Sequence, residues 1–353
     1  MKRALAGRVA LARRLLPLFC VLLLCSATAS AQEHCGYPVA ILKSGFENGE
    51  QPPSVSLPPD NTPLVLTLDY PADNLTVGSD TIQIYGSYTG PSNTGIVANS
   101  TTMPTNASNF ASFPLALSPG SNLISVVATT LDGSPQTITR TVIYDANQRP
   151  DVEFQSAAFA DYAPARVAFS LNYRIPVGQT LLSRVEIDYD GDGIFDVDAA
   201  VPPARLEYAF GSGGFYTATA RLSFDDGNAG TPLIIRTSSA KVLMQTMAFT
   251  RQTLCGVYYG MKHRLQPGQS GIVSALNTLE PDLRPEFQTI WNDLGAGLTN
   301  AANQLGDIVD GQISDVTAEM LVAVPDPAVL GDFFGFPVVL RRGADGVWRI
   351  SEM

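Results

Sequence analysis

Aspartates at alternating positions are the sharpest chemical feature of this sequence. Asp188, Asp190, Asp192 and Asp196 lie in the segment DYDGDGIFD, with two glycines between them that let the chain turn. Carboxylate oxygens brought together in this way suit a hard cation, and calcium takes six to eight oxygen ligands at about 2.3–2.6 Å. The pattern therefore makes calcium a candidate ligand of this loop.

Compared with a calcium loop of the EF-hand type, the run is incomplete. Asp188, Asp190 and Asp192 fit the first, third and fifth positions of that pattern, and Asp196 fits the ninth. The twelfth position should be a glutamate and is Ala199. The same run also suits a plain strand-to-strand turn, in which aspartates accept hydrogen bonds from backbone amides without a metal. Both interpretations stay open at this stage.

Groups for acid–base or nucleophilic catalysis are few. The sequence holds two histidines, His34 and His263. His263 lies at the end of a predicted amphipathic helix, where a cation is usual because it faces the negative end of the helix dipole. The sequence contains no G-x-S-x-G elbow, H-E-x-x-H pair or P-loop. We therefore expect a protein that is not an enzyme.

The first 31 residues have the pattern of a cleaved export signal. Basic residues precede an apolar run at 15–25, and small residues then lead to Ala29-Ser30-Ala31. The run is too short to cross roughly 30 Å of hydrocarbon as a helix. We expect a mature chain that begins near Gln32 and acts in the periplasm, at the cell surface or as a secreted protein.

Removal of this signal makes the chain more acidic. The whole chain carries 22 basic and 33 acidic residues, and loss of the five basic residues of the signal leaves 17 against 33, a net charge of −16. Such a surface repels phosphate backbones, so we expect no nucleic acid partner. No apolar run after Gln32 is long enough to span a membrane.

Two cysteines remain in the mature chain, Cys35 and Cys255. Two surviving thiols in an oxidising compartment favour a disulfide. The alternative is that both are unpaired, one buried and one in the N-terminal tail. We predict a Cys35–Cys255 bond that fastens the N-terminal extension to the C-terminal domain.

The elements that must position these residues are mostly short strands. Residues 32–60 are rich in proline and predict an extended linker. In residues 61–146 apolar positions alternate, as in PLVLTLD, and turn signals recur at the spacing of a β-sandwich. The segments YPADNLTVGSDTIQIYGSYTGPSNTGIVAN and FPLALSPGSNLISVVATTLDGSPQTITRTVIYD resemble the two halves of a bacterial immunoglobulin-like domain. This resemblance implies a spacer or binding role.

A second β-rich stretch covers residues 147–245. Its centre reads RVEIDYDGDGIFDVD and is followed by LEYAFGSGGFYTATARLSFDDG. It resembles a polycystic-kidney-disease-type (PKD) domain, in which a strand runs into an aspartate–glycine turn. Ile187 stands where that family often has tryptophan, and Tyr208 and Tyr216 fit its later strands. The resemblance implies a second immunoglobulin-like sandwich.

Helical spacing replaces the alternation in residues 246–353. Leu254, Val257, Tyr258 and Met261 recur on one helical face, and strand-like segments follow at the end of the chain. Helices followed by an antiparallel sheet indicate an α+β layout. The ending ADGVWRISEM resembles the last strand of the cone-shaped nuclear-transport-factor-like and cystatin-like domains.

That resemblance implies a pocket between the helices and a curved sheet. Tyr258, Trp291 and Trp348 are candidates to line it, and the alternative is that these aromatic residues fill the core. A deep pocket that holds an ionisable group would favour weak acid–base chemistry.

Taken together, the sequence predicts a mainly β chain with two tandem immunoglobulin-like β-sandwiches followed by a small α+β cone-fold domain. We expect an exported, non-catalytic protein of the binding or adhesion type, with a carbohydrate or protein partner and no cofactor beyond the calcium hypothesis. The alternatives are an accessory subunit or weak enzyme with a small-molecule pocket in the C-terminal domain, and a structural spacer of an envelope assembly.

Overall fold

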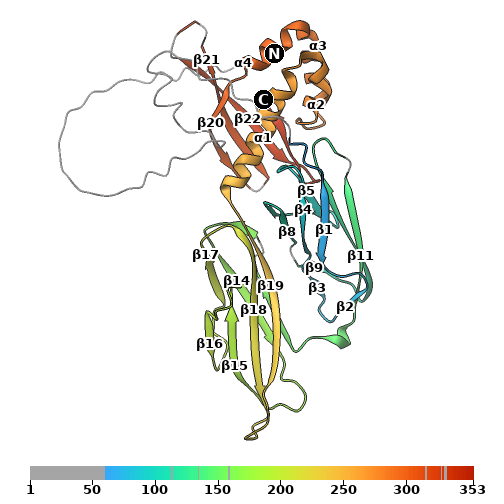
Figure 1. Ribbon diagram of the computed structural model, residues 1–353, viewed down its shortest axis with the longest axis vertical. Helices are drawn as coiled ribbons and strands as arrows, with labels where there is room; N and C mark the ends of the chain where they lie inside the picture. The colour runs from blue at the N-terminus through green and yellow to red at the C-terminus, as the bar shows by residue number, and fades with distance from the viewer. Residues whose placement is uncertain are drawn as a thin grey trace, which may run out of the picture.

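The computed structural model describes residues 60–112, 114–133, 135–157, 160–314, 316–326, 328–329 and 332–353. The predicted export signal, linker residues 32–59, His34 and Cys35 lie outside the described residues. The prediction of a mainly β chain with immunoglobulin-like sandwiches and a small C-terminal helical region is confirmed (Figure 1). Among the described residues, no helix combines the length and apolarity needed to cross a membrane.

The first sandwich packs a four-stranded sheet, ordered β1-β4-β8-β7, against a five-stranded sheet, ordered β2-β11-β10-β5-β6, with a small β3-β9 pair beside them. Strand β2 runs parallel to β11, and the other paired strands are antiparallel. The strands are β1 (Val65–Tyr70), β2 (Leu75–Val77), β3 (Thr81–Ile82), β4 (Tyr85–Thr89), β5 (Gly95–Ala98), β6 (Thr101–Met103), β7 (Thr105–Asn106), β8 (Asn109–Ala111), β9 (Leu115–Ala116), β10 (Gly120–Thr129) and β11 (Gln136–Tyr144).

Side chains that alternate along these strands form the core of the first sandwich, because successive residues of a strand point to opposite faces. Leu66 and Leu68 of β1 are buried, and so are Ile124, Val126 and Ala128 of β10. The alternating leucines Leu66 and Leu68 of the segment PLVLTLD therefore face the core, as the sequence pattern predicts.

The second sandwich follows a short 3-10 helix at Ala146–Gln148. It packs a three-stranded sheet, ordered β12-β14-β17, against a five-stranded sheet, ordered β13-β19-β18-β15-β16. The strands are β12 (Val152–Ser156), β13 (Ala160–Tyr162), β14 (Ala165–Tyr173), β15 (Leu181–Asp188), β16 (Val197–Ala199), β17 (Glu207–Phe210), β18 (Gly214–Asp225) and β19 (Ile234–Gln245).

Aromatic rings fill much of the core of the second sandwich. Phe154 and Phe169 stack with their ring centroids 5.1 Å apart, and Tyr189 packs 5.0 Å from Phe169. Ile187 is fully buried in the same cluster, which agrees with the need for an apolar residue at that position.

The third domain places helices against a four-stranded antiparallel sheet, ordered β20-β21-β22-β23. Helix α1 begins after Thr246, whose hydroxyl accepts a hydrogen bond from the amide of Phe249, and it ends in a basic turn that includes His263. The elements are α1 (Met247–Leu265), α2 (Ile272–Leu276), α3 (Arg284–Leu294), α4 (Leu298–Gln304), β20 (Asp307–Ile313), β21 (Thr317–Pro325), β22 (Phe333–Arg342) and β23 (Trp348–Glu352), with 3-10 turns at Gly268–Gly271 and Gly295–Gly297.

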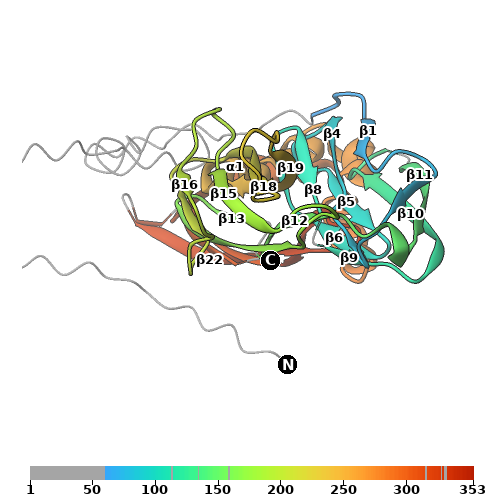
Figure 2. The ribbon, with the colours of Figure 1, turned by 90° about the horizontal axis from the view of Figure 1, so that it is seen from below.

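The three domains pack against one another rather than forming an extended row. The two sandwiches stand side by side, and the third domain lies across one end of the first sandwich and above the second (Figures 1 and 2). Strand β19 of the second sandwich contacts β7 and β8 of the first.

Candidate functional site

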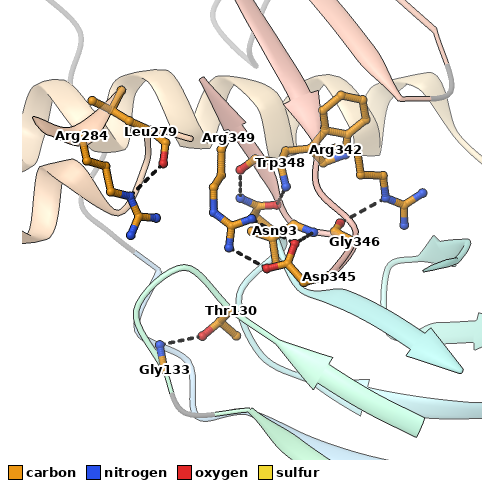
Figure 3. Close-up of polar contacts among 11 residues, drawn as sticks. Asn93, Thr130, Gly133, Leu279, Arg284, Arg342, Asp345, Gly346, Trp348 and Arg349 are labelled. Carbon is orange, nitrogen blue, oxygen red and sulfur yellow. Dashed lines mark hydrogen bonds and ion pairs between the residues drawn. The ribbon is translucent and has the colours of Figure 1, made fainter. Parts of the chain in front are cut away.

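An asparagine of the first domain forms two hydrogen bonds with the backbone of the third domain, as a neighbouring strand would. The side chain of Asn93, in the loop between β4 and β5, donates to the carbonyl oxygen of Trp348 and accepts from its amide, both at 2.9 Å (Figure 3). Asn93 is buried, so both hydrogen bonds are shielded from water. The last strand of the chain is thereby held by a loop of the first sandwich.

Two glycines allow the backbones to meet beside this asparagine. A Cβ atom on Gly95 would lie 2.1 Å from the carbonyl oxygen of Asp345, and one on Gly346 would lie 2.9 Å from the Cα atom of Gly95. Gly346 also has a φ of +79°, a conformation that favours glycine. No side chain fits at this contact without moving one domain.

A second loop of the first sandwich contacts the third domain through Asp132. Its carboxylate pairs with the guanidinium of Arg264 near the end of α1, and it accepts a hydrogen bond from the amide side chain of Asn277 at 3.0 Å. The hydroxyl of Thr130 accepts from the amide of Gly133 at 2.9 Å and holds the loop in shape (Figure 3). Two loops at one end of the first sandwich therefore contact the third domain.

Charged groups stabilise the turn between β22 and β23. Arg349 forms a two-bond pair with Asp345, at 2.9 and 2.7 Å, and Arg342 donates to the carbonyl oxygen of Gly346 (Figure 3). Arg342 also donates to the carbonyl oxygen of Met103 in the first sandwich. Burial alone would raise the pKa of Asp345, but the hydrogen bonds and charge of Arg349 outweigh it and hold that pKa below its usual value.

The two sandwiches are joined by side-chain amides in the same manner. The side chain of Gln83 donates to the carbonyl oxygen of Lys241 at 2.8 Å and accepts from its amide at 3.0 Å. Asn106 donates to the carbonyl oxygen of Met244, and Gln245 donates to that of Thr105. The three domains thus share a continuous set of polar contacts.

A cavity of about 480 Å³ lies where the three domains meet. We call it the three-domain cleft. Its lining is mostly hydroxyl, amide and aromatic groups, and the hydroxyls of Tyr162 and Thr250 lie 3.1 Å apart within it. The lining residues include Ser92, Asn93, Thr94, Thr102 and Thr105 from the first sandwich, Tyr162 and Gln245 from the second, and Phe249, Thr250, Thr253, Arg342 and Trp348 from the third domain.

The aspartate loop between β15 and β16 is built on hydrogen bonds to its own backbone. The two carboxylate oxygens of Asp188 accept from the amides of Gly191 and Gly193, at 2.7 and 2.9 Å. Asp190 accepts from the hydroxyl of Tyr208 at 2.8 Å, and this hydrogen bond raises the pKa of Tyr208 to about 12. Asp196 accepts from the amide that follows Asp188. These contacts are those of an aspartate turn.

Three of the four predicted ligands nevertheless come close together. Oxygens of Asp188, Asp190 and Asp196 lie within 4.8 Å of one another, whereas Asp192 is outside this group and accepts from the amide of Ile194. Desolvation within the loop, with the negative charges of Asp190 and Asp188, raises the pKa of Asp196. The three carboxylates thus have the charge and the spacing to bind a cation. The hydrogen bonds to the backbone also complete the turn when no cation is bound.

All three predicted pocket residues belong to the core of the third domain, and one of them also lines the three-domain cleft. Tyr258 and Trp291 lie in the core of the third domain, where the hydroxyl of Tyr258 donates to the carbonyl oxygen of Gly306 at 2.9 Å. Trp348 also packs in that core, and it lines the three-domain cleft as well. Cys255 is buried and disulfide-bonded, and its predicted partner Cys35 lies outside the described residues.

Sequence reasoning missed the residues that join the domains. Asn93 and Gly95 belong to the GPSNTG hairpin motif, and Asp345 and Gly346 belong to the ADGVW motif. Each motif was visible, but nothing in either one signals that the two meet 250 residues apart in sequence. The signal that the sequence offered was an asparagine between a proline and a glycine.

Comparisons with known proteins yield similarities to immunoglobulin-like and related modules. No protein-family model matches the sequence, and no curated protein matches it. The fibronectin(III)-like modules of Clostridium thermocellum CbhA share 17% identity with it, over 52% of this chain and 95% of theirs, at a TM-score of 0.19. Domains 5–6 of the S-layer protein SbsC share 11% identity, over 53% of this chain and 100% of theirs, at a TM-score of 0.25. Similarity at this level assigns no function.

Proposed function

We propose that this chain is an exported, non-catalytic binding protein and that its three-domain cleft holds a neutral carbohydrate. The observation that carries the proposal is the lining of the cleft, to which three domains contribute hydroxyl and amide side chains together with the aromatic residues Phe249 and Trp348. A sugar presents hydroxyl groups at its rim and apolar C–H groups on its faces, so both kinds of lining group have a counterpart.

The charges in the cleft support binding rather than acid–base chemistry. Among the described residues that line it, none is Asp, Glu or His. Arg342 carries the permanent charge there, and it donates to backbone carbonyl oxygens that hold the domain joint. An accessory enzyme would need a general acid or base in reach of its substrate.

Rigid walls add to the case for a preformed site. The pairs Asn93–Trp348 and Gln245–Thr105 fix the cleft from two sides, each through hydrogen bonds of 2.9 Å. A site that is already ordered loses less entropy when it binds a ligand. The bacterial immunoglobulin-like modules then serve mainly to build the cleft and to carry it.

The proposal is tested with Tyr162→Phe, which removes one hydroxyl from the cleft and keeps the ring. Neutral oligosaccharides are screened on an array against the mature chain, and the best ligand is titrated by calorimetry. We expect the variant to bind about three- to tenfold more weakly, the effect of one lost hydrogen bond.

The matched control is Tyr173→Phe, a half-exposed tyrosine of the second sandwich outside the cleft. We expect its affinity to equal that of the unchanged protein. Failure of every neutral glycan to bind, together with capture of a protein through residues 61–243 alone, would refute the carbohydrate assignment and favour a protein partner.

Finer assignments belong to the same proposal. Cleavage before Gln32 would deliver the protein to the periplasm, the cell surface or the medium, and N-terminal sequencing of the exported protein tests this. Burial of Ile187 supports the PKD-type assignment, and the order of helices and then sheet supports the cone-shaped one.

A further inference from the structure

The helix-facing side of the C-terminal sheet is covered over part of its area. Alternate residues of β22 share that side, where Leu340 and Val338 are 0% and 3% exposed but Phe336 and Phe334 are 51% and 42% exposed. The pairing of Phe336 with buried Val322 confirms that the two phenylalanines face the same way as the core. In Figure 1 this end of β21 and β22 extends beyond the helices.

Cys255 lies in α1, the helix that packs on the same side of this sheet. It belongs to the buried core between α1 and the sheet and is disulfide-bonded. One helical turn further on, the hydroxyl of Tyr259 accepts from the amide of Ile308 at 3.0 Å. Ile308 pairs with Val322, and Val322 pairs with Phe336. Ile308 and Phe336 are thus two strand spacings apart, roughly 10 Å at 4.8 Å per strand, and Cys255 lies one helical turn of about 5.4 Å before Tyr259. The seven residues 36–42 can extend up to about 24 Å, which is enough to cover this separation.

The N-terminal part of the chain contains a cysteine that could bond to Cys255, and it is long enough to reach this end of the sheet. The other cysteines of the sequence, at 20, 25 and 35, all precede Asp60, and the predicted cleavage leaves Cys35. Asp60 itself lines a cavity of about 500 Å³ with Gly256 and Arg264 of α1. Residues 36–59 can span up to about 80 Å, far more than the breadth of one helix.

We propose that the segment Tyr37–Leu42, fastened by a Cys35–Cys255 disulfide, covers Phe334 and Phe336. The segment reads YPVAIL, begins two residues after Cys35, and is followed by the polar run KSGFENGEQ. Two thiols form the bond with loss of two protons and two electrons, which an oxidised dithiol of the export compartment accepts. This inference is independent of what the three-domain cleft binds.

The test compares the oxidised mature chain with two variants. Peptide mapping without reductant identifies the disulfide, and hydrogen exchange is followed in peptides that cover residues 333–338. We expect a Cys35–Cys255 linked peptide, and amide exchange at 333–338 about tenfold faster in Cys35→Ser. Ile41→Ser with Leu42→Ser should give the same acceleration while the disulfide stays intact.

The matched control is Val177→Ser, which changes a fully exposed aliphatic residue of the second sandwich and should leave exchange at 333–338 unchanged. If Cys35→Ser does not fold, reduction of the folded unchanged chain supplies the same comparison. Disulfide-linked dimers on a non-reducing gel would overturn the proposal in favour of a second copy. An intact Cys35–Cys255 bond with unaltered exchange in the Ile41→Ser, Leu42→Ser variant would also overturn it.

Discussion

Asp188 uses both of its carboxylate oxygens to hold the backbone of the loop that it begins. Asp188 is buried, with 6% of its surface exposed. Its replacement by alanine leaves the amides of Gly191 and Gly193 without these acceptors. We expect Asp188→Ala to lower the free energy of unfolding by about 2–4 kcal/mol, measured by urea denaturation. Asp192→Asn changes an exposed member of the same loop and should cost less than about 0.5 kcal/mol. Equal effects would show that Asp188 has no special place in the turn.

Calcium remains a hypothesis for the same loop, and titration distinguishes it from the plain turn. A bound cation would neutralise the repulsion among Asp188, Asp190 and Asp196, whose oxygens already lie within 4.8 Å. Under that hypothesis calcium gives a heat of binding and a higher melting temperature, and Asp190→Asn abolishes both. A mature chain whose melting temperature is the same with calcium and with a chelator contains the turn alone.

At the scale of elements, the contact between the β4–β5 loop and the β22–β23 turn requires glycine, because a side chain on either backbone would collide with the other. Gly95→Ala would place a methyl group 2.1 Å from the carbonyl oxygen of Asp345, so the first and third domains must separate. We expect a loss of about 1–3 kcal/mol in urea denaturation and a larger radius of gyration in solution scattering. The control Gly211→Ala has open space around the added methyl group. An unchanged radius in Gly95→Ala would mean that the joint is not as tight as described.

The elements themselves were largely predictable, and the joints between them were not. Alternation in PLVLTLD placed Leu66 and Leu68 in a core because the period of a strand is two. The aspartate spacing placed Asp188, Asp190 and Asp196 together, although Asp192 points elsewhere. The three-domain cleft could not be foreseen, because its residues come from strands, a helix and loops of three separate domains, and the periodicity of one element does not say which other domain it will contact.

At the scale of the whole molecule, acid should weaken the Asp345–Arg349 ion pair of the β22–β23 turn, which lies against the first sandwich. The folded pKa of Asp345 lies below its usual value of 3.8, so folding favours its charged form. That contribution is fully present above the unfolded pKa and is lost as the pH falls through the folded pKa. We expect the melting temperature to fall as the pH drops below about 4. Asp345→Asn should reduce this acid-dependent fall, and an identical pH profile would exclude Asp345 as its source.

One consequence follows from the neighbours Ser92 and Asn93. The amide of Ser92 donates to the carboxylate of Asp60 at 3.3 Å, and the side chain of Asn93 holds Trp348 at the start of the last strand. Asp60 is therefore held next to the contact that fixes the start of the last strand, and β23 runs on from there to Glu352. A force applied at Asp60 and at Trp348 would act across this joint between the first and third domains, and the second sandwich would lie outside its path.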